Sequence, residues 1–251
     1  MPGCDRRRTR RSAVAKLEIV PEDWERALAV VAHPDDLEYG AAAAVARWTD
    51  QGKAVSYLLV TSGEAGIDTM APDECARVRQ DEERRSAALV GVDTVEFLAH
   101  PDGLVEASIA LRRDLATAIR RHRPEVVLSI NFRDSWGGPS FNHADHRATG
   151  VALLDAVRDA GNRWVFPGAG GEPWSGVRFA LFSGAPDATH GADVTATVDR
   201  GIASLREHRT YLEALDPGST DDPTAFLRAN AEAAGPRLGV AAAATFELIA
   251  L

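Results

Sequence analysis

The chain has 251 residues, of which 45% are hydrophobic and 26% are charged, and this length and composition suit one large globular domain. No apolar run approaches the 18 residues of a membrane-spanning helix, so the sequence excludes a membrane span. The net charge is −9 and the first 16 residues carry +5, so the rest carries −14, which argues against nucleic acid as a partner of the folded part.

The N-terminal segment differs from the rest of the chain. Residues 1–20 are rich in arginine and lack the apolar segment of a secretory signal, so we expect a basic, disordered tail before a single catalytic domain at 21–251. Cys4 lies in this tail and Cys75 in a polar helix start. We therefore expect no structural disulfide and a location in the reducing cytoplasm.

From residue 27 onward, apolar strand patterns alternate with helical patterns. The expected strands are 27–32, 54–60, 95–98, 126–130, 177–182, 192–198 and 246–251. The expected helices are 40–51, 72–90, 108–122, 143–160 and 199–215. Short buried strands that alternate with helices are typical of a parallel sheet covered on both faces. The expected fold class is therefore α/β and Rossmann-like, with a mostly parallel sheet and helices on both faces.

Two pairs of candidate metal ligands follow two of these strands. His33 and Asp36 come directly after the first strand, and His143 and His146 begin the helix at 143–160. Each pair alone is more typical of a helix cap or a surface arrangement. Together they favour a metal site, because residues three apart share a helix face and the carboxyl ends of parallel strands collect ligands. Catalytic zinc commonly takes three protein ligands, which leaves one histidine free for acid chemistry.

Asp35 and Asp36 are neighbours and should have different roles. Adjacent side chains on an extended turn point apart, so Asp35 can face the reacting water if Asp36 faces the metal. A carboxylate beside that water is a general base, and a metal ion lowers the pKa of water and polarises a carbonyl group. The pattern indicates metal-assisted hydrolysis.

The two motifs resemble those of a known family. Residues 32–36, Ala-His-Pro-Asp-Asp, are similar to the first signature of the LmbE-like, or PIG-L, metal-dependent de-N-acetylases, and residues 143–147, His-Ala-Asp-His-Arg, are similar to the second. Residues 61–64, 79–82 and 102–103 also resemble family positions. The resemblance covers roughly residues 27–155.

This resemblance implies a role for each motif residue. His33, Asp36 and His146 would bind one zinc ion per chain, although nitrogen and oxygen ligands also accept Fe²⁺. Asp35 would be the general base. His143 would stabilise the oxyanion or protonate the leaving amine, and Asp145 would orient His143.

Further residues are candidates for binding the substrate. By resemblance, Arg79 and Asp102 would hold a sugar, with a helix salt bridge and a turn as the structural alternatives. Trp136 either stacks on a sugar ring or packs, and Glu64 either contacts substrate or braces the metal site. Phe141 stands where the mycothiol-pathway enzyme has an assisting tyrosine, which argues against a simple transfer of that substrate.

The functional hypothesis is a cytoplasmic zinc-dependent deacetylase that cleaves the N-acyl amide of an N-acetylglucosamine-type amino sugar or its conjugate. A homo-oligomer is left open.

One alternative is an amidase or deacylase of a thiol conjugate or glycopeptide antibiotic on the same scaffold. A Rossmann-type nucleotide-binding protein is disfavoured, because the first turn lacks Gly-x-Gly-x-x-Gly and carries two aspartates where a pyrophosphate would lie. A non-catalytic metal-binding module is the third alternative. His208 is expected on the solvent-exposed face of a polar helix.

Overall fold

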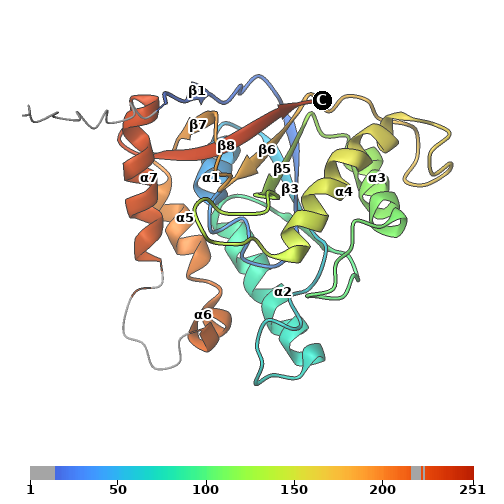
Figure 1. Ribbon diagram of the computed structural model, residues 1–251, viewed down its shortest axis with the longest axis horizontal. Helices are drawn as coiled ribbons and strands as arrows, with labels where there is room; N and C mark the ends of the chain where they lie inside the picture. The colour runs from blue at the N-terminus through green and yellow to red at the C-terminus, as the bar shows by residue number, and fades with distance from the viewer. Residues whose placement is uncertain (1–14, 216–221, 223) are drawn as a thin grey trace, which may run out of the picture.

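The computed structural model describes residues 15–215, 222 and 224–251. Within them, eight strands form one sheet in the order β1-β7-β8-β6-β5-β2-β3-β4 (Figure 1). The strands are β1 Glu18–Ile19, β2 Arg26–Val31, β3 Ala54–Leu59, β4 Thr94–Phe97, β5 Val126–Ile130, β6 Phe179–Ser183, β7 His190–Asp193 and β8 Ala243–Ala250. The helices are α1 Ala42–Asp50, α2 Pro72–Leu89, α3 Ile109–His122, α4 Ala144–Gly161, α5 Val198–Leu205, α6 Arg209–Leu215 and α7 Ala225–Leu238.

The parallel half of the sheet determines where the site lies. Strands β4, β3, β2, β5 and β6 are neighbours in this order and run parallel. The chain builds outward from β2 to β4 and then returns to add β5 and β6 on the other side of β2. The order therefore reverses between β2 and β5, and such a switch point leaves a crevice at the carboxyl ends of the strands. The segments after β2 and β5 carry the two His/Asp motifs, so both motifs meet there.

Helices cover both faces of the sheet, which confirms the expected fold class. Along β2, Ala27, Ala29 and Val31 belong to one apolar core, whereas Leu28 and Val30 belong to a second core. Residues of α1 and α2 complete the first core, and residues of α3 and α4 complete the second. Figure 1 shows α3 and α4 on one side of the sheet and α1, α5 and α7 on the other.

The C-terminal part differs from the sequence-based expectation. The expected strand at 192–198 ends at Asp193, and Val198 already begins α5. In place of the expected helix at 199–215, the structure has two helices, α5 and α6, and residues 206–208 separate them. The interruption lets His208 turn into the interior, where it is fully buried. Helix α7 was not expected, and strand β8 begins three residues before the expected strand at 246–251.

The packed part of the chain begins earlier than residue 21. Strand β1 pairs with β7 in parallel, and the flanking Leu17 and Val20 are buried. The boundary expected at residue 20 therefore lies too far along the chain, because Leu17 and Val20 already join the core. Residues 1–14 of that tail, including Cys4, lie outside the described residues. No helix among the described residues is both long and apolar enough to cross a membrane.

Candidate active site

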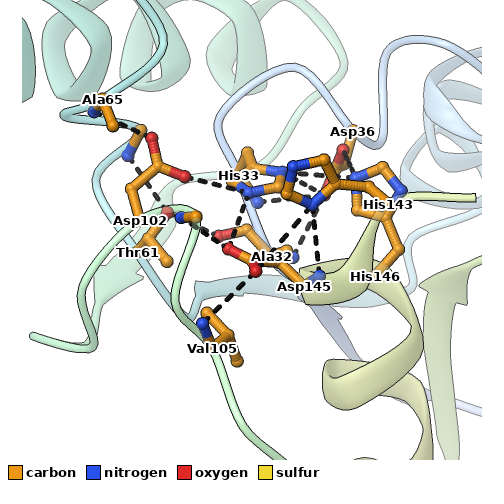
Figure 2. Close-up of polar contacts among 12 residues, drawn as sticks. Ala32, His33, Asp36, Thr61, Ala65, Asp102, Val105, His143, Asp145 and His146 are labelled. Atoms are coloured by element: carbon orange, nitrogen blue, oxygen red, sulfur yellow. Dashed lines mark hydrogen bonds and ion pairs between the residues drawn. The ribbon is translucent and has the colours of Figure 1, made fainter.

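Asp36 is fixed by the backbone that leads out of β2. Its Oδ2 accepts hydrogen bonds from the backbone N–H groups of Ala32 and His33 at 3.1 and 2.9 Å. The other oxygen, Oδ1, lies 3.1 Å from Nε2 of His146, which is in the first turn of α4 (Figure 2). Burial raises the pKa of Asp36, but His146 and His33 hold this pKa well below its usual value. The side chain is therefore a carboxylate aimed at His146.

The ring of His146 presents a lone pair from Nε2. Its Nδ1 lies 2.9 Å from Oδ1 of Asn142. The amide nitrogen of Asn142 donates to the carbonyl groups of Asn131 and Arg133 at 2.7 and 2.9 Å, so Oδ1 must be the acceptor for His146. Nδ1 of His146 therefore carries the hydrogen, and Nε2 is free to bind a metal ion.

The ring of His33 is held from its other side. Its Nε2 lies 3.0 Å from Oδ1 of Asp102 and 3.3 Å from Oδ2 of Asp145, so Nε2–H donates to carboxylates and Nδ1 presents its lone pair. Burial would lower the pKa of His33, but Asp102, Asp145 and Asp36 raise it well above its usual value. These carboxylates therefore favour positive charge at Nδ1, which a proton or a bound cation would supply.

His33, Asp36 and His146 suit a divalent metal ion. The candidate ligand atoms of the three residues all lie within 4.8 Å of one another. Nδ1 of His33 and Nε2 of His146 are only 3.2 Å apart, so either a proton or a metal ion must lie between the two nitrogens. Two imidazole nitrogens and a carboxylate are a common catalytic donor set for Zn²⁺ and also for Fe²⁺.

Asp35 has an unusual backbone conformation beside these ligands. Its φ angle is +96°, a region that non-glycine residues rarely adopt and that costs about 1–3 kcal/mol. The backbone N–H donates to Oε2 of Glu83 at 3.1 Å, and Oδ1 lies 3.2 Å from Nη2 of Arg79. Burial raises the pKa of Asp35 to about 6, although Arg79 acts to lower it. A carboxylate with this pKa is mostly ionised at neutral pH and is still a useful base.

Arg79 holds the loops around Asp35. It is buried, donates to the carbonyl groups of Pro34 and Gly63, and lies over the ring of Tyr211 at 3.9 Å from its centroid. A Cβ atom at Gly63 would lie 2.4 Å from Nη1 of Arg79, and the φ angle of Gly63 is +66°. This loop therefore requires glycine for the guanidinium group to reach Asp35.

His143 offers a hydrogen-bond donor at the cleft. Its Nδ1 accepts the backbone N–H of Asp145 at 3.1 Å, so the neutral ring carries its hydrogen on Nε2. Burial and the neighbouring His33 lower the pKa of His143, which favours this neutral form. The carboxylate of Asp145 accepts from the backbone of Gly103 and Val105 and lies closer to His33, at 3.3 Å, than to His143, at 3.8 Å. The carboxylate of Asp145 thus supports His33, and Asp145 contacts His143 through its backbone N–H instead of through the expected side chain.

Of the other residues expected to bind substrate, Asp102 and Trp136 line the cleft and Glu64 does not. Asp102 lines the cleft, but its carboxylate accepts from Ala65 at 2.9 Å and contacts His33. Glu64 accepts from the backbone N–H groups of Ser62 and Asp102, so it braces the Asp102 loop and is not among the residues that line the cleft. Trp136 does line it, with its ring edge-on to His146 at 5.8 Å.

The cleft has a volume of about 610 Å³ and joins both motifs. Sequence reasoning missed part of its lining, namely Tyr39, Tyr211, Phe226 and Asn230. Tyr39 follows Asp36 by three residues and could have been found from the motif. Phe226 and Asn230 belong to the unexpected helix α7. Phe141 is 69% exposed and lies outside this lining.

A buried ionic cluster lies behind Asp35. Nε2 of His208 is 3.6 Å from Oε2 of Glu83 and 3.9 Å from Oε2 of Glu38, and all three side chains are buried. Burial alone would lower the pKa of His208, but Glu38 and Glu83 raise it to about 9. The expected solvent exposure of His208 is therefore wrong. Its ring lies beside two carboxyl groups that the polar sequence pattern could not locate.

Comparison with known proteins agrees with this geometry. The chain is 35% identical over 141 residues to diacetylchitobiose deacetylase from Thermococcus kodakarensis, covering 55% of this chain and 51% of that protein. It is 27% identical to 1D-myo-inositol 2-acetamido-2-deoxy-alpha-D-glucopyranoside deacetylase 2 from Saccharopolyspora erythraea, covering 75% and 84% of the two chains. The match therefore spans about half the length of the first relative.

A solved structure and a family model complete the comparison. The structure of N,N'-diacetylchitobiose deacetylase from Pyrococcus horikoshii superposes with a TM-score of 0.80 at 25% identity, covering 91% of this chain and 85% of that one. The model of the PIG-L family, described as GlcNAc-PI de-N-acetylase, matches residues 28–157. Because this match covers just over half of the chain and includes both His/Asp motifs, the chain belongs to the PIG-L family.

Proposed function

We propose that this protein is a metal-dependent de-N-acylase that hydrolyses the N-acyl amide of an N-acetylglucosamine-type amino sugar or its conjugate. The observation that carries the proposal is the convergence of three metal-type ligands and a separate buried carboxylate on one cleft. His33, Asp36 and His146 would hold the ion, and Asp35 lines the same cleft without belonging to that ligand set. The sugar deacetylases among the relatives support the substrate class.

The residues around the cleft divide the chemistry between them. His33, Asp36 and His146 would hold a divalent cation, which would polarise the amide carbonyl as a Lewis acid and lower the pKa of a reacting water. Asp35 accepts the proton of that water as its oxygen bonds to the carbonyl carbon. Nε2–H of His143 donates a hydrogen bond to the developing oxyanion.

The second half of the reaction uses the same proton. As the carbon–nitrogen bond breaks, Asp35 returns its proton to the leaving nitrogen, which yields a carboxylic acid and a free amine. Arg79 keeps Asp35 in place at 3.2 Å, and the pKa of about 6 lets this carboxyl group both accept and release a proton near neutral pH.

The test is the pair Asp35→Asn and His146→Ala, assayed on N-acetylglucosamine and N,N'-diacetylchitobiose by release of free amine. Asp35→Asn should retain one metal ion per chain by elemental analysis and lose about 10²–10⁴-fold in kcat, the usual contribution of a general base. His146→Ala should lose both metal and activity. Full activity in Asp35→Asn would show that Asp35 is not the general base. Activity without bound metal would contradict the metal-dependent mechanism.

Several finer points remain predictions of the same proposal. Zinc is the proposed ion, and anaerobic reconstitution with Zn²⁺ or Fe²⁺ distinguishes it from iron. A substrate panel that includes thiol conjugates and glycopeptide antibiotics distinguishes amino-sugar deacetylation from the alternatives on the same scaffold. The nucleotide-binding alternative is disfavoured, because the buried carboxylates of Asp35 and Asp36 occupy the first turn. Cytoplasmic location and oligomeric state are open to fractionation and size-exclusion measurements.

A further inference from the structure

A second cavity of about 260 Å³ adjoins the cleft. Its walls come from α5, α7 and β8 and from the turn before α1. Tyr39, Gly184 and Asn230 line both this cavity and the cleft, so the two are neighbours across these residues. On the cleft side, the ring of Tyr39 stacks on Phe226 with centroids 5.9 Å apart and planes inclined by 18°. A chain attached to a substrate at Asp35 would have to pass these residues to enter the cavity.

The chemistry of the cavity wall favours an alkyl chain over a sugar. Most of the lining side chains are small or branched and apolar, among them Val198, Ile202, Ala231, Ala234, Ala243 and Ala244. The polar lining side chains are Glu38, Tyr39, Asn230 and Thr245, and one oxygen of Glu38 already accepts from Ser86 at 2.6 Å. A sugar ring would bury several hydroxyl groups with few partners, which is costly, whereas an alkyl chain needs none.

Small residues lie at the helix contacts around this space. A Cβ atom at Gly201 of α5 would lie 2.8 Å from the backbone nitrogen of Ala43, so α5 lies directly against α1 at this point. On the opposite wall, α7 presents Ala231 and Ala234 to the space. The space is partly open to solvent, as the cleft is, so its apolar side chains are accessible to a ligand.

We propose that this cavity binds an apolar chain of the substrate that is longer than an acetyl group. The inference rests on the proposed de-N-acylase function. The chain could be the N-acyl group itself or an alkyl aglycone on the sugar, and both bring methylene groups into the same apolar wall. Each buried methylene should raise kcat/KM about fourfold, until the cavity is full.

Two substrate series on the metal-loaded enzyme test the proposal. The first is glucosamine with N-acetyl, N-butanoyl, N-hexanoyl and N-octanoyl groups, and the second is N-acetylglucosamine with methyl, butyl and octyl aglycones. We expect kcat/KM, measured by release of free amine, to rise with chain length in one series, and that series identifies the source of the chain. Equal values along both series would overturn the proposal.

Two variants on α7 connect the effect to the cavity. Ala231→Leu places a larger side chain in the cavity and should bring the ratio of kcat/KM for the longest and shortest substrates close to one. Ala233→Leu is the matched control, because Ala233 is exposed on the same helix and does not line the cavity. The control should keep the wild-type ratio. An unchanged ratio in Ala231→Leu, or the same loss in both variants, would contradict the assignment.

A binding measurement separates this inference from the proposed function. N-octylglucosamine and N-ethylglucosamine have an amine where the substrate has an amide, so their binding does not depend on hydrolysis. By calorimetry, the octyl compound should bind the wild type more tightly, and Ala231→Leu should lose the difference. If neither series is hydrolysed but this difference persists, the proposed function fails and the cavity assignment holds. Hydrolysis with no dependence on chain length in either assay overturns the cavity assignment alone.

Discussion

Glu83 is expected to support catalysis without touching the substrate. Its Oε2 accepts the backbone N–H of Asp35 at 3.1 Å, and Asp35 has a φ angle of +96°. Loss of this acceptor would let the Asp35 backbone relax and turn the carboxylate away from the reacting water. Glu83→Ala removes the acceptor, whereas Glu83→Gln keeps an amide oxygen at the same place and removes only the ionisable group.

The size of the effect follows from the bond that is lost. Burial and the neighbouring Glu38 raise the pKa of Glu83 well above its usual value, so we count its hydrogen bond as a neutral one, which contributes about 0.5–1.5 kcal/mol, and the strain at Asp35 is about 1–3 kcal/mol. If the whole hydrogen-bond contribution is lost from the transition state, kcat of Glu83→Ala falls about 2- to 13-fold. KM should change little, because Glu83 is buried and is not among the residues that line the cleft.

The assay compares kcat, KM, metal content and thermal stability of wild type, Glu83→Ala and Glu83→Gln. Both variants remove a carboxylate from His208, which lies 3.6 Å away, so any loss of stability from that contact is common to both. The difference in kcat between them isolates the hydrogen bond to Asp35. If Glu83→Gln is as slow as Glu83→Ala, or if both keep wild-type kcat, the positioning role of Glu83 is refuted.

Three further predictions concern the metal ligand, the buried cluster and the loop glycine. Asn142→Ala removes the acceptor for His146 Nδ1–H and should weaken metal binding about 10- to 100-fold in competition with a chromogenic chelator. The pKa of His208 is raised to about 9 from an unfolded value near 6.5, so its stabilisation is complete below pH 6.5 and is lost as pH rises through about 9. Urea unfolding of wild type and His208→Gln should therefore differ by roughly 3 kcal/mol more at pH 6 than above pH 10. Gly63→Ala collides with Arg79 and should lower the unfolding free energy by about 1–3 kcal/mol, whereas no change would show that the loop adapts.

The parallel half of the fold could be predicted because its signals are local. Strand β2 and strand β5 are continuous apolar runs that end in polar motifs, and α2 begins with Pro72 and is followed by Gly91. The C-terminal third has weaker signals. The helical pattern at 199–215 runs through His208, but tertiary packing buries this residue and divides the helix. A polar residue with a buried partner elsewhere in the chain cannot be recognised from periodicity.

The candidate site could be predicted only in part, for the same reason. His33, Asp36 and His146 were found because each lies at a strand exit or a helix start and has a neighbour three residues away. The ring hydrogen of His33 depends on Asp102 and Asp145, which come from other segments. That of His146 depends on Asn142, four residues earlier, which is not one of the motif residues. Glu83 was overlooked because it lies in the middle of a charged helix, where a solvated face is the usual interpretation.

The distribution of charge explains why adjacent aspartates can differ in function. The carboxylates of Asp36, Asp102 and Asp145 surround His33, each within 3.7 Å of one of its ring nitrogens, so that side of the cleft is strongly negative and favours a divalent cation. Asp35 turns the other way because its backbone has a positive φ angle, and it meets Arg79 instead. One ion pair cannot offset complete burial, and the pKa of Asp35 therefore rises to about 6. The turn after β2 thus carries the proposed metal ligand and the proposed base on consecutive residues, and the backbone conformation of Asp35 directs their carboxylates to different partners.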